Sequence, residues 1–444
     1  MRIAIATWSN RKVGGTETYL GDIMRRLADR GHELCLIYET DEPSTRDLIE
    51  LPAGNPSWSI AQTGLKRALT SLQNWQPDII FCQGLKDTRV ESRLLKIAPA
   101  VLFAHTYYGT CISGEKTFKR PVAEPCTQRF GAKCLLNYYP HRCGGLSPIT
   151  MLRLYGTQVQ RLANVNRYQA VVTHSSYMRD EFVRQGCDPK RIHNISYYSD
   201  RFSFGEQIAG RLNAPASPVQ IAIERSGEMP LRLLFLGRMS FLKGGQTLID
   251  ALAPAHKLLR RPLHVTFAGD GPERKKWQRE AEHLAAQNDW LTIDFAGWLK
   301  GERLHAAFAE TDLLVFPSLW PEPFGLIGLE TGHHGVPIAA FDVGGIPDWL
   351  FDGINGHLAS GKPPTPQGLA EAIWKCLRDS NEHKSLRRGA IEVANTFSMQ
   401  EHLNRLLSIF EQVVPAKETS QPSSATISAN EAGSQLRRMG AWSQ

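Results

Sequence analysis

Two glutamates eight positions apart, Glu322 and Glu330, lie where a buried strand gives way to a helix. The strand is expected to end at Phe316, a proline-rich loop follows, and the helix is expected to begin near Phe324. Vicinal hydroxyls pair well with the two oxygens of a carboxylate. A spacing of about two helical turns lets one glutamate hold a sugar-like group and the other a ribose. The alternative is two surface glutamates on an ordinary helix.

The start of this helix is a second chemical feature. The first turn of a helix presents unpaired backbone N–H groups and a partial positive charge, which suit an anion or a hydroxyl. We therefore expect the backbone of Phe324, Gly325 and Leu326 to contact a ligand.

Arg238 and Lys243 follow a predicted strand that ends at Leu236, so both are expected to point into a cleft. A guanidinium together with an ammonium suits a diphosphate leaving group, whose negative charge grows as its bond to a sugar breaks. The pair would replace a metal ion, and no Asp-x-Asp motif is present to hold one. We therefore expect no required cofactor. The alternative is two solvated basic residues beside a glycine turn.

Gly14 and Gly15 occupy the first predicted strand-to-helix turn. Glycine lets the backbone approach a phosphate closely, so this pair is expected to meet the same diphosphate from the opposite side of a cleft. A tight turn without a ligand is the alternative, because glycine pairs are common in turns.

These residues need a scaffold that brings strand ends together. Short apolar runs alternate with helical patterns, and strand, glycine turn, helix and strand form a βαβ unit with a parallel sheet. Ligands of such sheets bind beyond the carboxyl ends of the strands. Two such series predict an α/β protein with two Rossmann-like domains facing each other across a cleft. The expected strands are 2–7, 33–38, 78–82, 100–104 and 169–173, then 231–236, 263–267, 291–295, 313–316 and 338–341.

The composition excludes several classes of protein. Hydrophobic residues make up 42% and charged residues 21% of the 444 residues, as in ordinary globular chains. The net charge of +7 is too small and too dispersed to indicate nucleic-acid binding. The apolar start ends at Ala6, too short for a signal peptide, and no apolar run is long enough to cross a bilayer. We expect a cytoplasmic protein, peripheral at the inner face of the membrane if it contacts one.

The order and spacing of the motifs resemble the retaining glycosyltransferases of family 4, which have the GT-B fold. The similarity covers most of residues 1–400 and includes the Glu-x7-Glu motif. The other matching segments are Val13-Gly-Gly-Thr-Glu17, Arg30-Gly-His-Glu-Leu34, Gly237-Arg-Met-Ser-Phe-Leu-Lys-Gly244, Ala268-Gly-Asp-Gly-Pro272, Phe295-Ala-Gly-Trp298 and Val343-Gly-Gly-Ile-Pro-Asp348.

The resemblance implies roles for further residues. His105, after the strand at 100–104, would touch the donor sugar, and a neutral-to-charged switch near pH 6–7 would suit that role. The nucleotide base would lie against loops that contain Gly269, Gly297 and Trp298. For Trp298, a place in the core is the alternative.

The predicted organisation has an acceptor-side domain at 1–204, with a cysteine-bearing loop at 106–148. A linker at 205–228 leads to a nucleotide-sugar-binding domain at 229–396 and a terminal helix at 397–414. The segment 415–444 is rich in serine and poor in apolar residues, which predicts a disordered tail.

Cys111, Cys126, Cys134 and Cys143 lie within 33 residues, at gaps of 14, 7 and 8 residues. These gaps lack the tight Cys-x-x-Cys pairs of most zinc sites. A structural zinc ion, disulfides and unlinked thiols all stay open as interpretations of this cluster.

A helical pattern at 151–167 mixes Arg153, Arg161 and Arg167 with apolar residues. One interpretation is a basic amphipathic helix that touches anionic lipid, as in similar enzymes with lipid-linked acceptors. The other is a helix packed on the first sheet.

The resemblance implies a retaining, hexosyltransferase-type enzyme of cell-surface polysaccharide or glycolipid biosynthesis. It would move a sugar from a nucleotide-diphosphate sugar to a hydroxyl of a polysaccharide, lipid-linked or small-molecule acceptor. Two alternatives stay open. One is a nucleotide-sugar epimerase or hydrolase on the same scaffold, and the other is a non-catalytic nucleotide-sugar-binding component of a polysaccharide assembly complex.

Overall fold

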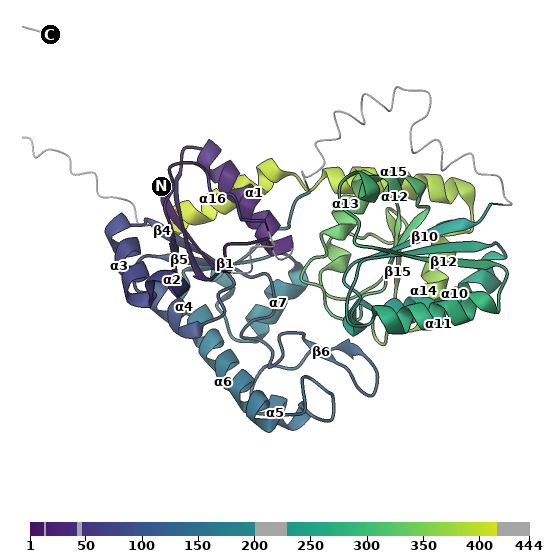
Figure 1. Cartoon of the computed structure of the whole chain (residues 1–444), viewed down its shortest axis with the longest axis horizontal. Helices are drawn as coiled ribbons and strands as arrows, with labels where there is room; N and C mark the ends of the chain where they lie inside the picture. The colour runs from purple at the N-terminus through teal and green to yellow at the C-terminus, as the bar shows by residue number, and fades with distance from the viewer. Residues whose placement is uncertain (13–14, 42–46, 200–228, 415–444) are drawn as a thin grey trace, which may run out of the picture.

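The N-terminal half is built on a sheet of seven parallel strands in the order β3-β2-β1-β4-β5-β8-β9. The computed structural model describes residues 1–12, 15–41, 47–199 and 229–414 (Figure 1). Central strands such as β4 are buried along their whole length, which explains their continuous apolar sequences. The strands are β1 (Arg2–Ser9), β2 (Glu33–Thr40), β3 (Ser57–Ser59), β4 (Ile79–Gln83), β5 (Ala100–Phe103), β8 (Ala170–Thr173) and β9 (Ile192–Asn194).

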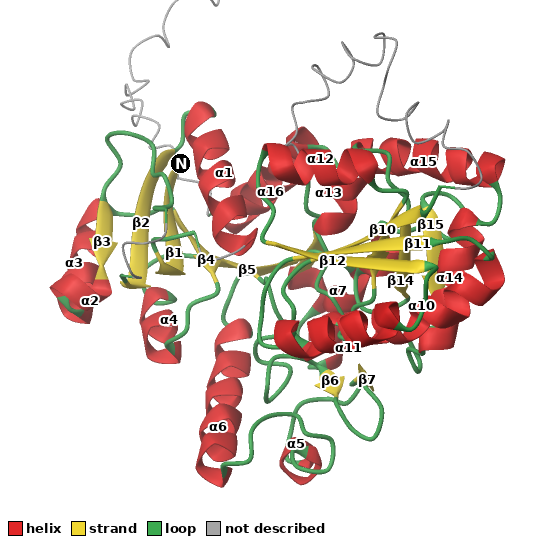
Figure 2. Ribbon diagram, turned by 45° about the vertical axis from the view of Figure 1, so that its right-hand side comes forward, coloured by secondary structure: helices red, strands yellow, loops and turns green. Residues whose placement is uncertain are grey.

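Helices cover both faces of this sheet (Figure 2). In α1, Tyr19, Leu20, Ile23, Met24 and Leu27 are buried, as their helical spacing predicts. A short antiparallel pair, β6 (Thr117–Phe118) and β7 (Glu124–Pro125), lies between β5 and β8 in the chain. The helices are α1 (Gly15–Asp29), α2 (Ile60–Thr63), α3 (Leu65–Trp75), α4 (Thr88–Leu94), α5 (Lys133–Asn137), α6 (Pro148–Val165) and α7 (Ser176–Arg184).

The second half has the same architecture, a parallel sheet with helices, and its six strands lie in the order β12-β11-β10-β13-β14-β15. Its strands are β10 (Leu231–Leu236), β11 (Leu263–Ala268), β12 (Leu291–Gly297), β13 (Leu313–Phe316), β14 (Ile338–Phe341) and β15 (Gly356–Ala359). Its helices are α10 (Gly245–Leu259), α11 (Arg274–Ala286), α12 (Glu302–Glu310), α13 (Ile327–His333), α14 (Pro366–Leu377) and α15 (Ser380–Asn395).

The last described helix, α16 (Met399–Val413), returns to the N-terminal half and lies beside α1 (Figure 1). The ring of Phe410 meets Phe81 of β4 edge to face, with centroids 5.0 Å apart. His402 hydrogen-bonds the hydroxyl of Tyr19 at 2.8 Å. The terminal helix is therefore part of the N-terminal core, a placement that its sequence pattern did not reveal.

All ten expected strands are present, with ends that differ by at most two residues. The sequence did not predict β3, β9 and β15, which are three or four residues long. The predicted linker at 205–228 and the predicted tail at 415–444 lie outside the described residues.

The two halves meet at the carboxyl ends of their strands. At the start of α7, the backbone N–H of Ser176 donates to the carboxylate of Asp348 at 2.6 Å. In the loop after β5, the ring of Tyr107 lies edge to face with Trp320 of the loop after β13, with centroids 6.4 Å apart. These contacts place the loops after β5 and β8 opposite the loops after β13 and β14.

Candidate active site

Glu322 lies in the loop between β13 and α13 and is only 4% exposed. The hydroxyl of Ser318 donates to its Oε1 at 2.6 Å, and the ammonium of Lys243 lies 2.6 Å from the same oxygen. The backbone N–H of Gly345 also donates to the carbonyl of Glu322 at 2.7 Å. The buried carboxylate is therefore held by Ser318 of its own loop and by Lys243 of the loop after β10, and the backbone of Glu322 is held by Gly345 of the loop after β14.

A glycine makes the ion pair between Lys243 and Glu322 geometrically accessible. Gly244 has φ +69° and is the N-cap of α10, directly after Lys243. A Cβ atom at this position would lie 1.8 Å from the carbonyl oxygen of Pro317. Only glycine lets the turn after β10 approach the loop that carries Glu322 so closely.

Arg238 does not share in this pair. Its side chain is exposed, and no ion pair or side-chain hydrogen bond to it occurs within residues 1–12, 15–41, 47–199 and 229–414. The sequence predicted that Arg238 and Lys243 act side by side on a diphosphate. The structure places both after β10, but the ammonium is paired with Glu322 and the guanidinium is open to solvent.

A cavity of about 130 Å³ lies between α1 and α13. Gly15 borders it from the first half of the protein, and Leu326 and Glu330 border it from the second. Residues predicted to meet one ligand from two sides are thus brought to one cavity. Its remaining lining is Tyr19, Asp22, Tyr197, Tyr198, Ser199 and Ile327. Gly14, the partner of Gly15 in the prediction, lies outside the described residues.

Glycines lie at the carboxyl ends of three adjacent strands of the second sheet: Gly237 directly follows β10, Gly269 directly follows β11, and Gly297 is the last residue of β12. The N–H of Gly237 bonds to the carbonyl of Ala268, and the N–H of Gly269 bonds to the carbonyl of Gly297 at 2.7 Å. A Cβ atom on Gly269 would lie 1.9 Å from the carbonyl oxygen of Gly237. At Gly269 the missing side chain leaves room for the carbonyl of the neighbouring strand end, whereas nothing lies within 4 Å of a Cβ position at Gly237 or Gly297, so a flat ligand can approach the backbone at these two glycines.

Comparison with known families accounts for this arrangement. Residues 13–196 match the profile of Glycosyltransferase Family 4, and residues 217–393 match that of Glycosyl transferases group 1. The chain belongs to the family 4 glycosyltransferases. The resemblance inferred from the motifs is confirmed, since the two profiles together span nearly all of both sheets.

Curated relatives of this family 4 glycosyltransferase include an uncharacterized glycosyltransferase of Methanocaldococcus jannaschii. The two are 29% identical over 85% of this chain and 90% of that one. A D-inositol 3-phosphate glycosyltransferase of Salinispora tropica is 28% identical over 55% of this chain. The match spans about half the length of that relative, 51%.

Solved structures share the whole fold. HepE of Anabaena in complex with UDP superposes with a TM-score of 0.62 at 18% identity, covering 93% of this chain and 100% of that one. WaaG, a glycosyltransferase involved in lipopolysaccharide biosynthesis, gives a TM-score of 0.62 at 17% identity, covering 92% and 99%. The expected GT-B fold, with two Rossmann-like domains, is confirmed.

In this family 4 glycosyltransferase, the helix after Glu322 begins later than the sequence suggested. It was expected near Phe324 and begins at Ile327. Gly325 has φ +97°, which an α-helix does not accommodate, and the indole N–H of Trp349 donates to the carbonyl of Phe324 at 2.6 Å. Phe324, Gly325 and Leu326 therefore form a turn that leads into α13 rather than its first turn.

His105 follows β5 as predicted, but it does not titrate near neutral pH. Its Nε2 donates to Oε1 of Gln83 at 2.6 Å, and its Nδ1 accepts from the hydroxyl of Tyr197. Burial lowers the pKa of His105 to about 3. The expected switch near pH 6–7 is therefore wrong, because the neutral ring is already satisfied by two protein partners.

Several buried polar atoms near this edge have no hydrogen-bond partner among the described residues. They include His174 Nε2 and Thr173 Oγ1 at the end of β8, and Gln83 Nε2 at the end of β4. The hydroxyl of Tyr107 and the indole nitrogen of Trp320 are two more. Buried polar groups are normally paired, so these unpartnered atoms indicate places for ligand hydroxyls. Sequence reasoning missed these residues, although Gln83 and Thr173 end strands and His174 directly follows one.

Trp298 is 56% exposed, so the alternative of a core residue is wrong.

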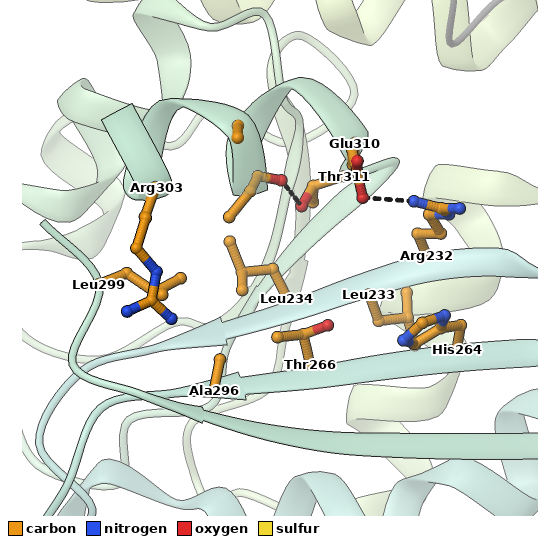
Figure 3. A pocket seen from close by; sticks show the side chains of 12 residues that line it. Arg232, Leu233, Leu234, His264, Thr266, Ala296, Leu299, Arg303, Glu310 and Thr311 are labelled. Atoms are coloured by element: carbon orange, nitrogen blue, oxygen red, sulfur yellow. Dashed lines mark hydrogen bonds and ion pairs between the residues drawn. The ribbon is translucent and has the colours of Figure 1, made fainter. Parts of the chain in front are cut away.

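A separate cavity of about 320 Å³ lies between α12 and strands β10, β11 and β12, and Figure 3 shows the side chains that line it. Arg232 and Glu310 pair at its rim at 2.6 Å, and none of the predicted site residues lines it.

The four clustered cysteines come together within one loop. Burial is the larger cause of the raised pKa of Cys126, Cys134 and Cys143, and charge repulsion from Cys111 raises the pKa of all three further. Burial raises the pKa of Cys126 to about 11 and that of Cys143 to about 12. All four are free thiols, and no set of three or more metal-binding side chains within the described residues is placed to hold an ion. Zinc at this cluster stays a prediction.

Proposed function

We propose that this protein transfers a sugar from a nucleoside-diphosphate sugar to a hydroxyl acceptor, with retention of the anomeric configuration. The observation that carries the proposal is the buried Glu322, paired with Lys243 and close to Tyr107 of the N-terminal domain, whose hydroxyl has no partner among the described residues. Glu322 binds hydroxyls of the donor sugar, and Glu330 binds the ribose. Arg238 and Lys243 neutralise the diphosphate as it departs.

The reaction balances without a side-chain nucleophile. The acceptor oxygen forms a bond to the anomeric carbon on the face from which the diphosphate leaves, while the bond from that carbon to the phosphate oxygen breaks. The acceptor's proton passes to the departing diphosphate. His105, neutral through its low pKa, is not suited to carry this proton.

The nucleotide is proposed to rest against the glycine edge formed by Gly237, Gly269 and Gly297. HepE of Anabaena was solved with UDP and with UDP-glucose, which supports UDP-sugars as the first donors to test. We further propose a hydroxyl acceptor of cell-surface polysaccharide or glycolipid synthesis, since WaaG acts in lipopolysaccharide biosynthesis.

Product analysis tests this function. The purified protein is incubated with UDP-, GDP-, ADP- and TDP-sugars, with and without a panel of sugar, inositol phosphate and polyprenyl-linked hydroxyl acceptors. We expect an α-linked product from an α-linked donor, seen in the anomeric proton coupling by NMR. A β-linked product would refute retention. An epimerised or hydrolysed donor that forms equally well without acceptor would instead support the isomerase or hydrolase alternative.

A further inference from the structure

A further cavity between the two halves lies next to the candidate active site. Its volume is about 300 Å³, and it is here called the β14–β15 pocket. One wall consists of Pro125 in β7 and Tyr177 in α7, and the other consists of residues 342–344 and 360–362, which follow β14 and β15. Small-molecule sites occupy roughly 300–1,000 Å³. None of the residues predicted to bind the donor lines this pocket.

Strand order places the pocket directly beyond Glu322. The glycines proposed for the nucleotide follow β12, β11 and β10, Glu322 follows the next strand, β13, and the pocket follows β14 and β15. Neighbouring strands lie about 4.8 Å apart. A Cβ atom on Gly344 would lie 2.4 Å from the backbone nitrogen and oxygen of Glu322, so the pocket packs against the loop of this glutamate. A donor that reaches from the glycine edge to Glu322 would end at this pocket, where its acceptor must lie.

Three aromatic side chains lead from the pocket to Glu322. The ring of Tyr177 lies edge to face with Tyr107, with centroids 6.1 Å apart, and Tyr107 contacts Trp320 in the same way. The ammonium of Lys243, which pairs with Glu322, lies 5.6 Å from the ring of Trp320. The two hydroxyls and the indole nitrogen are buried and have no hydrogen-bond partner among the described residues. A sugar offers C–H groups to such rings and hydroxyls to such polar atoms.

A buried ion pair fixes the wall of the pocket that belongs to the first half. The ammonium of Lys116 lies 2.6 Å from the carboxylate of Glu181, and both side chains are at most 1% exposed. Lys116 precedes β6, the partner strand of β7, and Glu181 lies one turn after Tyr177 in α7. Burial, more than the nearby Glu181, raises the pKa of Tyr177, so its hydroxyl keeps its proton and can donate. The pair therefore holds Pro125 and Tyr177 in fixed positions.

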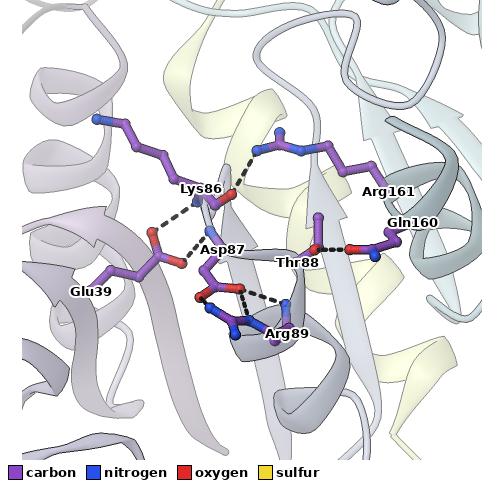
Figure 4. A network of polar contacts seen from close by, with 7 residues as sticks. All are labelled: Glu39, Lys86, Asp87, Thr88, Arg89, Gln160 and Arg161. Carbon is purple, nitrogen blue, oxygen red and sulfur yellow. Dashed lines mark hydrogen bonds and ion pairs between the residues drawn. The ribbon is translucent and has the colours of Figure 1, made fainter. Parts of the chain in front are cut away.

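The helix α6 fixes the middle ring of the three. Like every helix in the described residues, it is not long and apolar enough to cross a membrane. The guanidinium of Arg161 in α6 donates to the carbonyl of Lys86 at 2.9 Å (Figure 4). The same guanidinium lies over the ring of Tyr108, 4.0 Å from its centroid. Tyr107, next to Tyr108 in the chain, is thereby held between the other two rings.

The charged groups of the pocket favour a neutral ligand. Asp342 and Lys362 are exposed, and neither side chain forms an ion pair or a hydrogen bond within the part of the chain that the structure describes. The two oxygens of a carboxylate suit vicinal hydroxyls, and an ammonium donates to a further hydroxyl. A phosphate would meet Asp342 as a like charge. One carboxylate and one ammonium leave the pocket without net charge, which suits a sugar more than an anion.

We propose that the β14–β15 pocket binds a neutral sugar ring of the acceptor, so that the acceptor is a saccharide or carries one. Asp342 accepts from vicinal hydroxyls, and Lys362 and Tyr177 donate to others. The ring of Tyr177 packs against the sugar. A hydroxyl of this acceptor then reaches the donor sugar beside Glu322. The inference rests on the proposed function, because it names the acceptor of that reaction.

Saturation-transfer NMR on the full chain tests the pocket without any turnover. The probes are the methyl α- and β-pyranosides of glucose, galactose, mannose and N-acetylglucosamine, with myo-inositol 1-phosphate as the anionic comparison. We expect at least one pyranoside to bind, and to stay bound when UDP is added. Tyr177→Phe should weaken this binding roughly fivefold, and Asp342→Ala/Lys362→Ala roughly tenfold or more. Calorimetry should give the wild-type affinity for UDP in both variants.

Matched variants carry the same changes elsewhere. Tyr139→Phe alters a tyrosine of the first half that is 40% exposed. Asp289→Ala/Lys275→Ala removes one exposed carboxylate and one exposed ammonium of the second half, in the loop before β12 and in α11. Both controls should bind the pyranoside as the wild type does.

Four results would overturn the proposal. One is that no pyranoside binds although UDP does, which would leave the proposed function in place. Another is equal loss in the pocket and control variants. A third is binding that Glu322→Gln removes and the pocket variants do not, which would place the probe in the donor-sugar position. The fourth is binding of myo-inositol 1-phosphate and of no neutral pyranoside.

The same data separate this proposal from the proposed function. If UDP and the nucleotide sugars do not bind, but the pocket variants lose the pyranoside and the controls keep it, the pocket stands as a sugar site. The reaction proposed for the cleft would then be refuted alone.

Discussion

The ammonium of Lys243, just after β10, lies 2.6 Å from the carboxylate of Glu322, in the loop after β13. The two residues are 79 positions apart in the chain and meet because their strands are neighbours in the sheet. Glu322 is buried and also accepts from Ser318, so its charge is balanced before any ligand arrives. The carboxylate is preorganised, and a bound diphosphate would compete for the same ammonium.

Glu322→Gln tests the charge of this carboxylate. The amide keeps the size of the side chain and can still accept from Ser318, but it binds sugar hydroxyls more weakly than an anion does. We expect kcat to fall by roughly 10²–10³ with little change in folding. Steady-state transfer assays measure this, with Glu310→Gln on the surface of α12 as the control. Unchanged turnover in Glu322→Gln would remove Glu322 from the site.

Lys243→Met tests two roles of this lysine, its contribution to the stability of the fold and its contribution to UDP binding. It leaves Glu322 buried without its cation, which should cost about 1–3 kcal/mol of unfolding free energy. Adding Glu322→Gln should restore much of that loss, because the unpaired charge is then gone. Urea denaturation of the wild type, the two single variants and the double variant gives a double-mutant cycle of unfolding free energies. Calorimetry with UDP should show weaker binding in the two variants that lack Lys243. Full additivity of the two single changes would argue against a coupled pair.

Gly244→Ala tests the close approach of two loops. The new Cβ would lie 1.8 Å from the carbonyl oxygen of Pro317, and φ is +69°, so we expect a loss of about 2–4 kcal/mol. Gly31→Ala is the control, because Gly31 has φ +78° with nothing within 4 Å of its Cβ position. Its backbone cost alone should be about 1–2 kcal/mol. Equal losses would mean that the contact with Pro317 relaxes freely.

Buried histidines should make the protein sensitive to acid. Burial lowers the pKa of His402 to about 4, below the unfolded value of about 6.5. Below pH 6.5 the unfolded chain takes the proton first, so stability falls as the pH drops toward 4, by about 1.4 kcal/mol per pH unit for this group. Between pH 7.5 and 5, His402→Gln should lose about 2 kcal/mol less than the wild type. His283→Gln, an exposed change, should keep the wild-type slope in urea denaturation.

The sequence predicted the strands well because buried parallel strands are continuous apolar runs with few alternatives. It did not predict β3 and β9, which are too short to show such a run. It placed Glu322, Lys243 and Glu330 near strand ends but could not pair Lys243 with Glu322, since that contact depends on strand order. The amphipathic pattern of α16 predicted a helix and not its partner, the N-terminal sheet. The late start of α13 follows from the backbone of Gly325, which composition alone does not fix.

Donor binding tests the central claim most directly. Calorimetry with UDP-, GDP-, ADP- and TDP-sugars on the wild type, on Glu330→Ala and on Glu392→Ala asks whether the interdomain site holds a nucleotide sugar. We predict that one nucleotide binds selectively, that Glu330→Ala weakens it by roughly tenfold or more, and that Glu392→Ala on α15 does not. Binding of no donor, or equal binding in Glu330→Ala, would contradict a nucleotide-sugar site in this cleft.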